Sequence, residues 1–203
     1  MRERTIPSVD DMELVGGRLC LDFVNTVNRM HGRRCDERFA TFADVLRWSA
    51  RLGLINRAAA ARLGRSAVQF PDTAQGALQG IVALRECLWR LFTGRPGARD
   101  PGILQEALRG ILPRVRRRQD KAGIVLDPGR DLSDWLLLAV SWSALELLTS
   151  SSLSRVKSCP GDRCNWLFLD ASPNNRRKWC SMKTCGNRHK VREHYNRLRV
   201  DAS

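Results

Sequence analysis

Two cysteine pairs of identical spacing constrain this chain more than any other feature of its sequence. Four residues separate Cys159 from Cys164 and Cys180 from Cys185, and fifteen residues lie between the pairs. Four thiolates on two short loops can surround a Zn²⁺ ion tetrahedrally, with bonds of about 2.3 Å. The pattern predicts one zinc site whose ligands are Cys159, Cys164, Cys180 and Cys185. Unliganded core thiols and a redox-active disulfide are the alternatives.

Four cysteine ligands would close the coordination sphere of the metal. Catalytic zinc instead keeps one position open, and its ligands generally include a His or a carboxylate. His189 and His194 follow the second pair, but neither is needed as a ligand, and we expect both at the surface, where they can contact phosphate. We therefore predict a structural zinc ion, with Lys183 and Arg163 favouring the thiolate form of the ligands beside them.

The residues around the cysteines predict a small zinc finger. Residues 166 to 170 alternate as in a strand, with Trp166 and Phe168 on one face. The segment after Cys185 has helical periodicity and one apolar side. That side is formed by Val191, Tyr195 and Leu198. A knuckle, a hairpin, a second cysteine pair and a helix together match a treble-clef-like finger.

Positive charge is concentrated in the same part of the chain. The formal net charge is +14, and residues 155 to 203 contain twelve Lys or Arg against four Asp or Glu, a net +8. Such an excess attracts DNA, RNA or an anionic membrane surface, although a charge run can also be a solvated face. The candidate nucleic-acid contacts are Arg176, Arg177, Lys178, Lys183, Arg188, His189, Lys190, Arg192 and Arg197.

Two tryptophans bear on the kind of nucleic acid. Trp166 and Trp179 can stack on unpaired bases, which would favour RNA or single strands, or they can form the core of the finger. Arginines at 114, 116, 117 and 118 form a further cluster. They can extend the binding surface, or they can be a solvated charge on an edge strand that prevents its pairing with another chain. An acidic protein partner is the alternative to nucleic acid.

The residues before the finger predict a mainly helical (α+β) domain with one small β-hairpin. Helices are expected after the turn at Gly16 and Gly17, over 42–52 with Thr41 or Asp44 as its cap, over 57–63 with Gly64 as its stop, and over 71–92, 102–109 and 133–150. The first of these would include Val27. Strands are expected within 111–118 and 123–127. We divide the chain into a helical domain, 1–152, and a zinc finger, 153–203.

No secretory signal is visible at the N-terminus, and the most apolar stretch, 132–148, contains Asp134 and Glu146. With seven cysteines and no export signal, we expect a soluble cytoplasmic protein with no membrane association. His31 is the sole histidine before residue 150, and that region lacks a catalytic triad, a Gly-rich phosphate loop and paired carboxylates. An enzyme is therefore not expected.

Two motifs carry a family resemblance. Cys185-Gly186-Asn187-Arg188, together with Cys164-Asn-Trp-Leu-Phe-Leu-Asp and Arg176-Arg-Lys-Trp-Cys, resembles the CGNR zinc finger. Residues 15–26, Val-Gly-Gly-Arg-Leu-Cys-Leu-Asp-Phe-Val-Asn-Thr, are similar to the opening of the ABATE domain, which commonly precedes this finger. Pro173-Asn174-Asn175 departs from the more basic or serine-containing loop that we would expect.

The resemblance implies a bacterial, DNA-binding, stress-related transcription regulator, and we expect its nucleic-acid partner to be double-stranded DNA. A homodimer and a small-molecule effector are further expectations. Within the N-terminal motif, Asp22 and Asn25 can line a ligand pocket, or they can cap helices and make internal hydrogen bonds.

Overall fold

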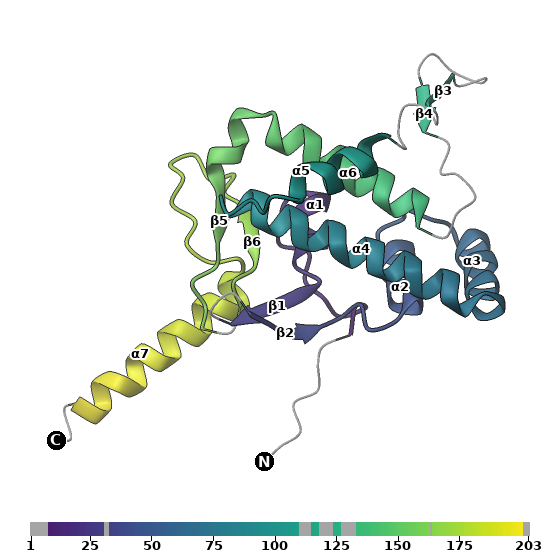
Figure 1. Cartoon of the computed structure of the whole chain (residues 1–203). Coiled ribbons are helices and arrows are strands. Elements are labelled where there is room, and N and C mark those ends of the chain that lie inside the picture. The colour runs from purple at the N-terminus through teal and green to yellow at the C-terminus, as the bar shows by residue number, and fades with distance from the viewer. Residues whose placement is uncertain are drawn as a thin grey trace.

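Helices make up most of the domain that precedes the finger (Figure 1). The computed structural model describes residues 8–30, 33–109, 115–117, 124–126, 133–162 and 164–200. The helices of this domain are α1 (Leu19–Val24), α2 (Phe42–Arg51), α3 (Arg57–Gln69), α4 (Pro71–Phe92), α5 (Asp100–Arg109) and α6 (Asp134–Leu148). The predicted mainly helical α+β class is confirmed.

Local sequence signals explain where several helices begin and end. Thr41 caps α2 by accepting a hydrogen bond from the Asp44 amide, and the Asp44 side chain bonds back to the Thr41 amide. This capping box satisfies two of the free amides at the helix start. Gly53 follows α2 with φ of 69°, a conformation that favours glycine. Pro71 opens α4 at a position where its missing N–H costs nothing.

The prediction that Gly64 stops α3 is wrong, because the helix continues to Gln69. Glycine inside a helix costs about 1 kcal/mol relative to alanine. That cost is offset by packing of α3 on α2, where a Cβ at Gly64 would lie 3.8 Å from Leu46. Helix α3 ends instead beside Phe70, which precedes Pro71 and is therefore biased away from helical geometry.

The prediction that Val27 continues the first helix is also wrong. Helix α1 ends at Val24, and Val27 begins a hairpin of β1 (Val27–Met30) and β2 (Arg33–Glu37). Its polar strands lack the alternation that marks a half-buried strand. Buried ion pairs hold it on α4 instead: Arg85, fully buried, donates to both carboxylate oxygens of Glu37 at 2.7 and 2.6 Å.

The predicted hairpin is confirmed where the structure describes it. Strands β3 (Val115–Arg117) and β4 (Ile124–Leu126) pair antiparallel. Its neighbours Arg114 and Arg118 lie outside the described residues, as do His31 and Arg163. The predicted role of the arginine cluster therefore stays a prediction.

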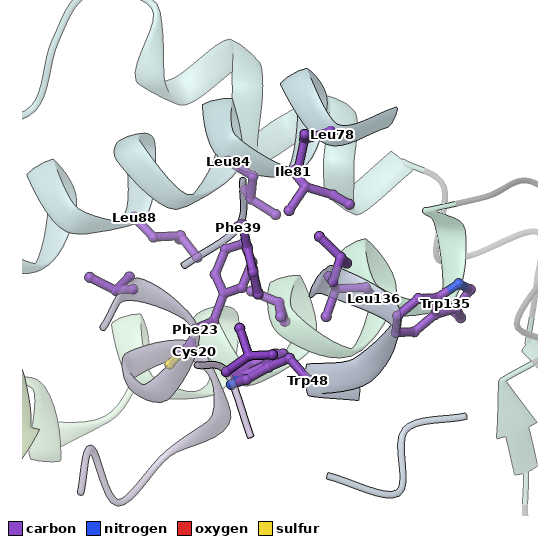
Figure 2. Close-up of a cluster of buried hydrophobic side chains, with 14 of the residues drawn as sticks. Cys20, Phe23, Phe39, Trp48, Leu78, Ile81, Leu84, Leu88, Trp135 and Leu136 are labelled. Atoms are coloured by element: carbon purple, nitrogen blue, oxygen red, sulfur yellow. The ribbon is translucent and has the colours of Figure 1, made fainter. Parts of the chain in front are cut away.

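An aromatic cluster lies at the centre of the helical domain (Figure 2). Phe39 and Trp48 meet edge to face with ring centroids 5.6 Å apart, and Phe23 lies 6.1 to 6.2 Å from both rings. Helix α4 covers the cluster with Leu84 and other leucines, and α6 contributes its own apolar face. The apolar stretch thus forms a mostly buried helix from Asp134 to Leu148, and in the described parts of the chain no helix has the length and apolarity needed to cross a membrane.

The finger begins directly after the helical domain and packs against it. Its elements are η2 (Ser151–Arg155), β5 (Val156–Ser158), β6 (Leu167–Leu169), η3 (Met182–Gly186) and α7 (Asn187–Val200). Strands β5 and β6 pair antiparallel, and β6 lies against α1. Helix α7 extends away from the rest of the molecule (Figure 1). The predicted division at residue 152 falls within η2 and stays a prediction.

Candidate metal centre and the basic surface around it

The four predicted ligands converge on one buried point. The Sγ atoms of Cys159, Cys164, Cys180 and Cys185 all lie within 4.8 Å of one another. Cys180 Sγ lies 3.5 Å from Cys164 Sγ and 3.6 Å from Cys185 Sγ. A tetrahedron with Zn–S bonds of about 2.3 Å has edges of about 3.8 Å, and a disulfide bond is about 2.05 Å long. The cluster therefore fits one structural zinc ion and not a disulfide.

The first knuckle depends on a residue without a side chain. A Cβ at Gly161 would lie 3.3 Å from both Cys164 Cβ and Cys185 Sγ, and 3.6 Å from Cys159 Sγ. The Cys164 amide donates to the Gly161 carbonyl at 3.0 Å, and the Cys159 amide donates to the Trp166 carbonyl at 2.8 Å. Glycine at 161 thus lets the loop close tightly around the metal while β5 and β6 hold it from outside.

The finger is joined to the helical domain by direct hydrogen bonds. Asn25 Nδ2 donates to the Leu167 carbonyl and Asn25 Oδ1 accepts from the Leu167 amide, both at 2.8 Å. The Leu169 amide donates to the Gly16 carbonyl at 2.8 Å. Trp166 Nε1 donates to Asn28 Oδ1 at 2.7 Å. The helical domain therefore pairs with β6 much as a neighbouring strand would.

Asp22 and Asn25, the candidate pocket residues, are both engaged inside the protein. Asp22 Oδ1 accepts from the Gly16 amide at 2.8 Å, and Asp22 is only 8% exposed. Burial raises the pKa of Asp22 to about 6, although the hydrogen bonds from the Gly16 and Val15 backbone act in the opposite direction. These contacts correspond to the internal hydrogen bonding that the sequence left open as the alternative to a ligand pocket.

One residue of the basic loop points inward. Arg177 donates to the backbone carbonyls of Val15, Leu169, Trp179 and Cys180. Its guanidinium also lies 4.4 Å from the centre of the Phe168 ring. Arg177 therefore holds the finger to the start of the helical domain, and these contacts compete with its predicted role as a nucleic-acid contact.

A buried carboxylate organises the loop that leads to Cys180. Asp170 is fully buried and accepts hydrogen bonds from Lys157 Nζ at 2.6 Å, from the Ser172 amide and hydroxyl, and from the Arg177 amide. Burial alone would raise the pKa of Asp170, but the bonds from Lys157, Ser172 and Arg177 hold it well below its usual range. Arg155 closes the other side of the loop through the carbonyls of Asp170 and Ser172.

Most of the other predicted contacts are exposed. Seven of the nine have exposed side chains: Arg176, Lys178, Lys183, Arg188, Lys190, Arg192 and Arg197. Arg192 is ion-paired with Asp162 of the knuckle. The other six, which we call the basic surface, have no acidic side-chain partner among the described residues. They are Arg176, Lys178, Lys183, Arg188, Lys190 and Arg197.

His189 is half-buried where α7 meets the metal site. Its ring centroid lies 4.7 Å from that of Trp179, and its Nε2 lies 3.1 Å from Glu193. Arg188, His189 and Arg192 line one side of a cavity of about 260 Å³ beside the knuckle. The first turn of α7 is thus anchored to the finger. Its predicted apolar side, Val191, Tyr195 and Leu198, is more than half exposed.

The fold and the site define a helical domain joined to a four-cysteine zinc finger. A family model named ABATE and described as "Putative stress-induced transcription regulator" matches residues 17–151, and the CGNR zinc finger model matches residues 155–198. The chain therefore belongs to the ABATE family and carries a CGNR zinc finger, as its two motifs predicted. No curated protein matches the chain.

The sequence did not reveal the residues that connect the two parts. Arg29 is the clearest case: its amide lies 3.5 Å from the Cys164 carbonyl, its carbonyl accepts from Asn165, and its side chain pairs with Glu86 at 2.8 Å. The guanidinium also lies 4.3 Å from the centre of the Trp89 ring. The sequence carries no signal for such contacts between distant segments.

Proposed function

We propose that this chain is a zinc-dependent transcription regulator whose finger binds double-stranded DNA. The basic surface carries the proposal: six exposed cationic side chains lie on α7 and the loops beside the zinc ligands, with no acidic partner among the described residues. Phosphate groups are the natural counter-charges for such a surface. The zinc ion contributes by fixing the loops from which these side chains project.

Helix α7 is the proposed groove-binding element. It extends from the body of the molecule (Figure 1), and its first turn is fixed by contact of His189 with Trp179. Arginine can bind guanine through two hydrogen bonds, whereas lysine mostly neutralises phosphate. We therefore assign base contacts to Arg188 or Arg197 and phosphate contacts to Lys178, Lys183 and Lys190.

The half-burial and the contacts of Trp166 and Trp179 favour duplex DNA over single strands. Trp166 is half-buried and donates its indole N–H to Asn28 at 2.7 Å, with Arg38 at 5.2 Å from the ring centre. Trp179 is half-buried against His189, and Lys178 Nζ lies 5.5 Å from the ring centre. Base stacking needs a free aromatic face, and these contacts compete for it.

The wider setting is part of the same proposal. A bacterial cytoplasmic regulator of this kind would act as a homodimer on paired half-sites and respond to a small-molecule effector through its helical domain. Its task would be binding and not catalysis, because the closed four-cysteine site leaves no coordination position for a substrate.

Selection of bound sequences from a random pool of duplexes tests the proposal. The zinc-loaded full chain is expected to enrich a defined sequence, and chelated protein is the matched control. Uniform recovery of all sequences at low salt would support DNA binding without sequence specificity. Failure of the zinc-loaded chain to retain duplex DNA at low salt would overturn the proposal, whether or not RNA is retained.

An acidic protein partner is the second candidate, and the apolar side of α7 favours it. Val191, Tyr195 and Leu198 are 54%, 62% and 52% exposed and lie on a cationic helix. An acidic amphipathic helix could cover such a face. Recovery of one acidic protein after nuclease treatment, with no shift of labelled DNA, would select this reading over the first.

A further inference from the structure

A second cavity lies in the helical domain, far in sequence from the zinc ligands. It has a volume of about 670 Å³ and is lined by residues of α4, α5 and α6. Apolar side chains contribute much of the wall, including Leu84, Ile103, Ala107 and Leu137. Small-molecule sites typically occupy about 300–1,000 Å³ and combine apolar walls with a few polar groups. The size and the lining both fall in that class.

Two helical glycines border the cavity without any packing reason for being glycine. A Cβ at Gly80 of α4 or at Gly102 of α5 would meet no atom of the described residues within 4 Å. Glycine weakens a helix interior relative to alanine. Since no neighbouring side chain fills the space beside Gly80 and Gly102, the two glycines leave the edge of the cavity open.

The charges at the cavity set the polarity of a ligand. Arg99 is exposed, is the one cationic residue of the lining, and has no acidic partner among the described residues. Of the two acidic residues, Glu106 is paired with Arg109 at 3.2 Å, and Asp134, which lies in the first turn of α6, is not free either. Arg99 is therefore the charged side chain of the lining that is free to pair with a ligand.

We propose that this cavity binds a small organic anion with an apolar body, such as an aromatic or aliphatic carboxylate or sulfonate. The apolar part would lie between α4 and α6 against Leu84 and Leu137, and the anionic group would face Arg99. This inference does not rest on DNA binding, because the binding of such an anion can be measured without nucleic acid.

Anilinonaphthalene sulfonate, an anionic aromatic dye, is a direct probe of this site. We expect its fluorescence to rise on addition of the folded, zinc-loaded chain. Gly80→Leu would fill the cavity and abolish most of that rise. Gly76→Leu is the matched control, because Gly76 lies one turn earlier on α4, a Cβ there also meets nothing within 4 Å, and it is not a lining residue. Both variants should raise the melting temperature.

Three outcomes would overturn the proposal. The first is no fluorescence rise with the folded wild-type chain, and the second is equal dye binding by the Gly80→Leu and Gly76→Leu variants. The third is a fall in melting temperature for Gly80→Leu alone, which would mean that another part of the chain fills the space. Arg99→Gln should weaken dye binding several-fold at unchanged melting temperature, and unchanged affinity would contradict the assigned polarity.

Discussion

The side-chain amide of Asn25 makes hydrogen bonds to both main-chain polar groups of Leu167, each at 2.8 Å. Leu167 is buried in β6, and Asn25 is buried at the end of α1. One asparagine thus supplies the donor and the acceptor that an adjacent strand would offer. The finger is consequently packed against the helical domain and is not joined to it by a flexible linker alone.

Asn25→Ala should destabilise the zinc-loaded chain by about 2–4 kcal/mol. The substitution leaves the buried N–H and C=O groups of Leu167 without partners, and each such group costs about 1–3 kcal/mol. Urea unfolding followed by tryptophan fluorescence measures the change. Asn174→Ala, in the exposed loop, is the control and should stay within about 0.5 kcal/mol of wild type. Equal stability of the two variants would show that the hydrogen bonds between Asn25 and Leu167 do not contribute to stability.

Asp22→Asn should make the protein more stable at neutral pH. The pKa of Asp22 is raised to about 6 in the folded chain, against about 3.9 when unfolded. The folded state therefore binds the carboxyl proton of Asp22 more tightly than the unfolded state does. The stability that this proton contributes to the wild-type protein below about pH 4 is lost as pH rises to about 6. Asn does not titrate, and its oxygen can still accept from Gly16. The stability of the variant relative to wild type should rise by about 2–3 kcal/mol across this window.

The matching experiment is urea unfolding of both proteins between pH 4 and pH 7.5. Protonation of the zinc ligands affects both chains alike, so the difference between them isolates residue 22. A difference that stays flat with pH would contradict the buried-carboxylate interpretation.

Gly161→Ala should speed loss of zinc severalfold. The new Cβ would lie 3.3 Å from Cys164 Cβ and Cys185 Sγ, so a ligand must move to make room. Release can be followed with a colorimetric zinc chelator. Gly102→Ala, where a Cβ meets nothing within 4 Å, provides the control. Equal release rates from the two variants would show that the knuckle tolerates a side chain.

Arg176→Ala and Arg177→Ala should have opposite signatures although the residues are adjacent. Loss of Arg177 removes bonds to four carbonyls and should lower stability by about 2 kcal/mol. Loss of Arg176, which is exposed, should leave the melting temperature unchanged. It should weaken DNA binding and reduce the salt slope by about 0.9. Interchanged effects would refute the assignment of the two side chains.

The metal centre could be predicted from sequence because cysteine spacing alone determines which side chains can meet. Helices α2 and α4 could be predicted for a similar reason, since Thr41 and Pro71 act on their own neighbours. The β1–β2 hairpin could not. Its strands are held by contacts such as that of Arg85 with Glu37, and those partners are 48 residues apart.

Whether a basic side chain points into the protein or toward solvent could not be predicted from the sequence either. Arg176 and Arg177 have the same chemistry and the same local sequence, yet one is exposed and the other is half-buried against Phe168. The outcome depends on where the carbonyls of Val15 and Leu169 lie, which is a property of the docked domains. Charge counting predicted a basic surface but could not sort its members.

The salt dependence of DNA binding tests the central claim most directly. A labelled random-sequence duplex is titrated with zinc-loaded chain and read by fluorescence anisotropy over a range of salt concentrations. A random sequence offers no selected base contact, so all six side chains of the basic surface are expected to contact phosphate, which predicts a slope of log K against log salt of about −5. Replacing Arg188, Lys190 and Arg197 with Gln should reduce it to about −3 at unchanged zinc content and melting temperature. Binding that is absent at low salt, or a slope that this triple variant leaves unchanged, would contradict the account.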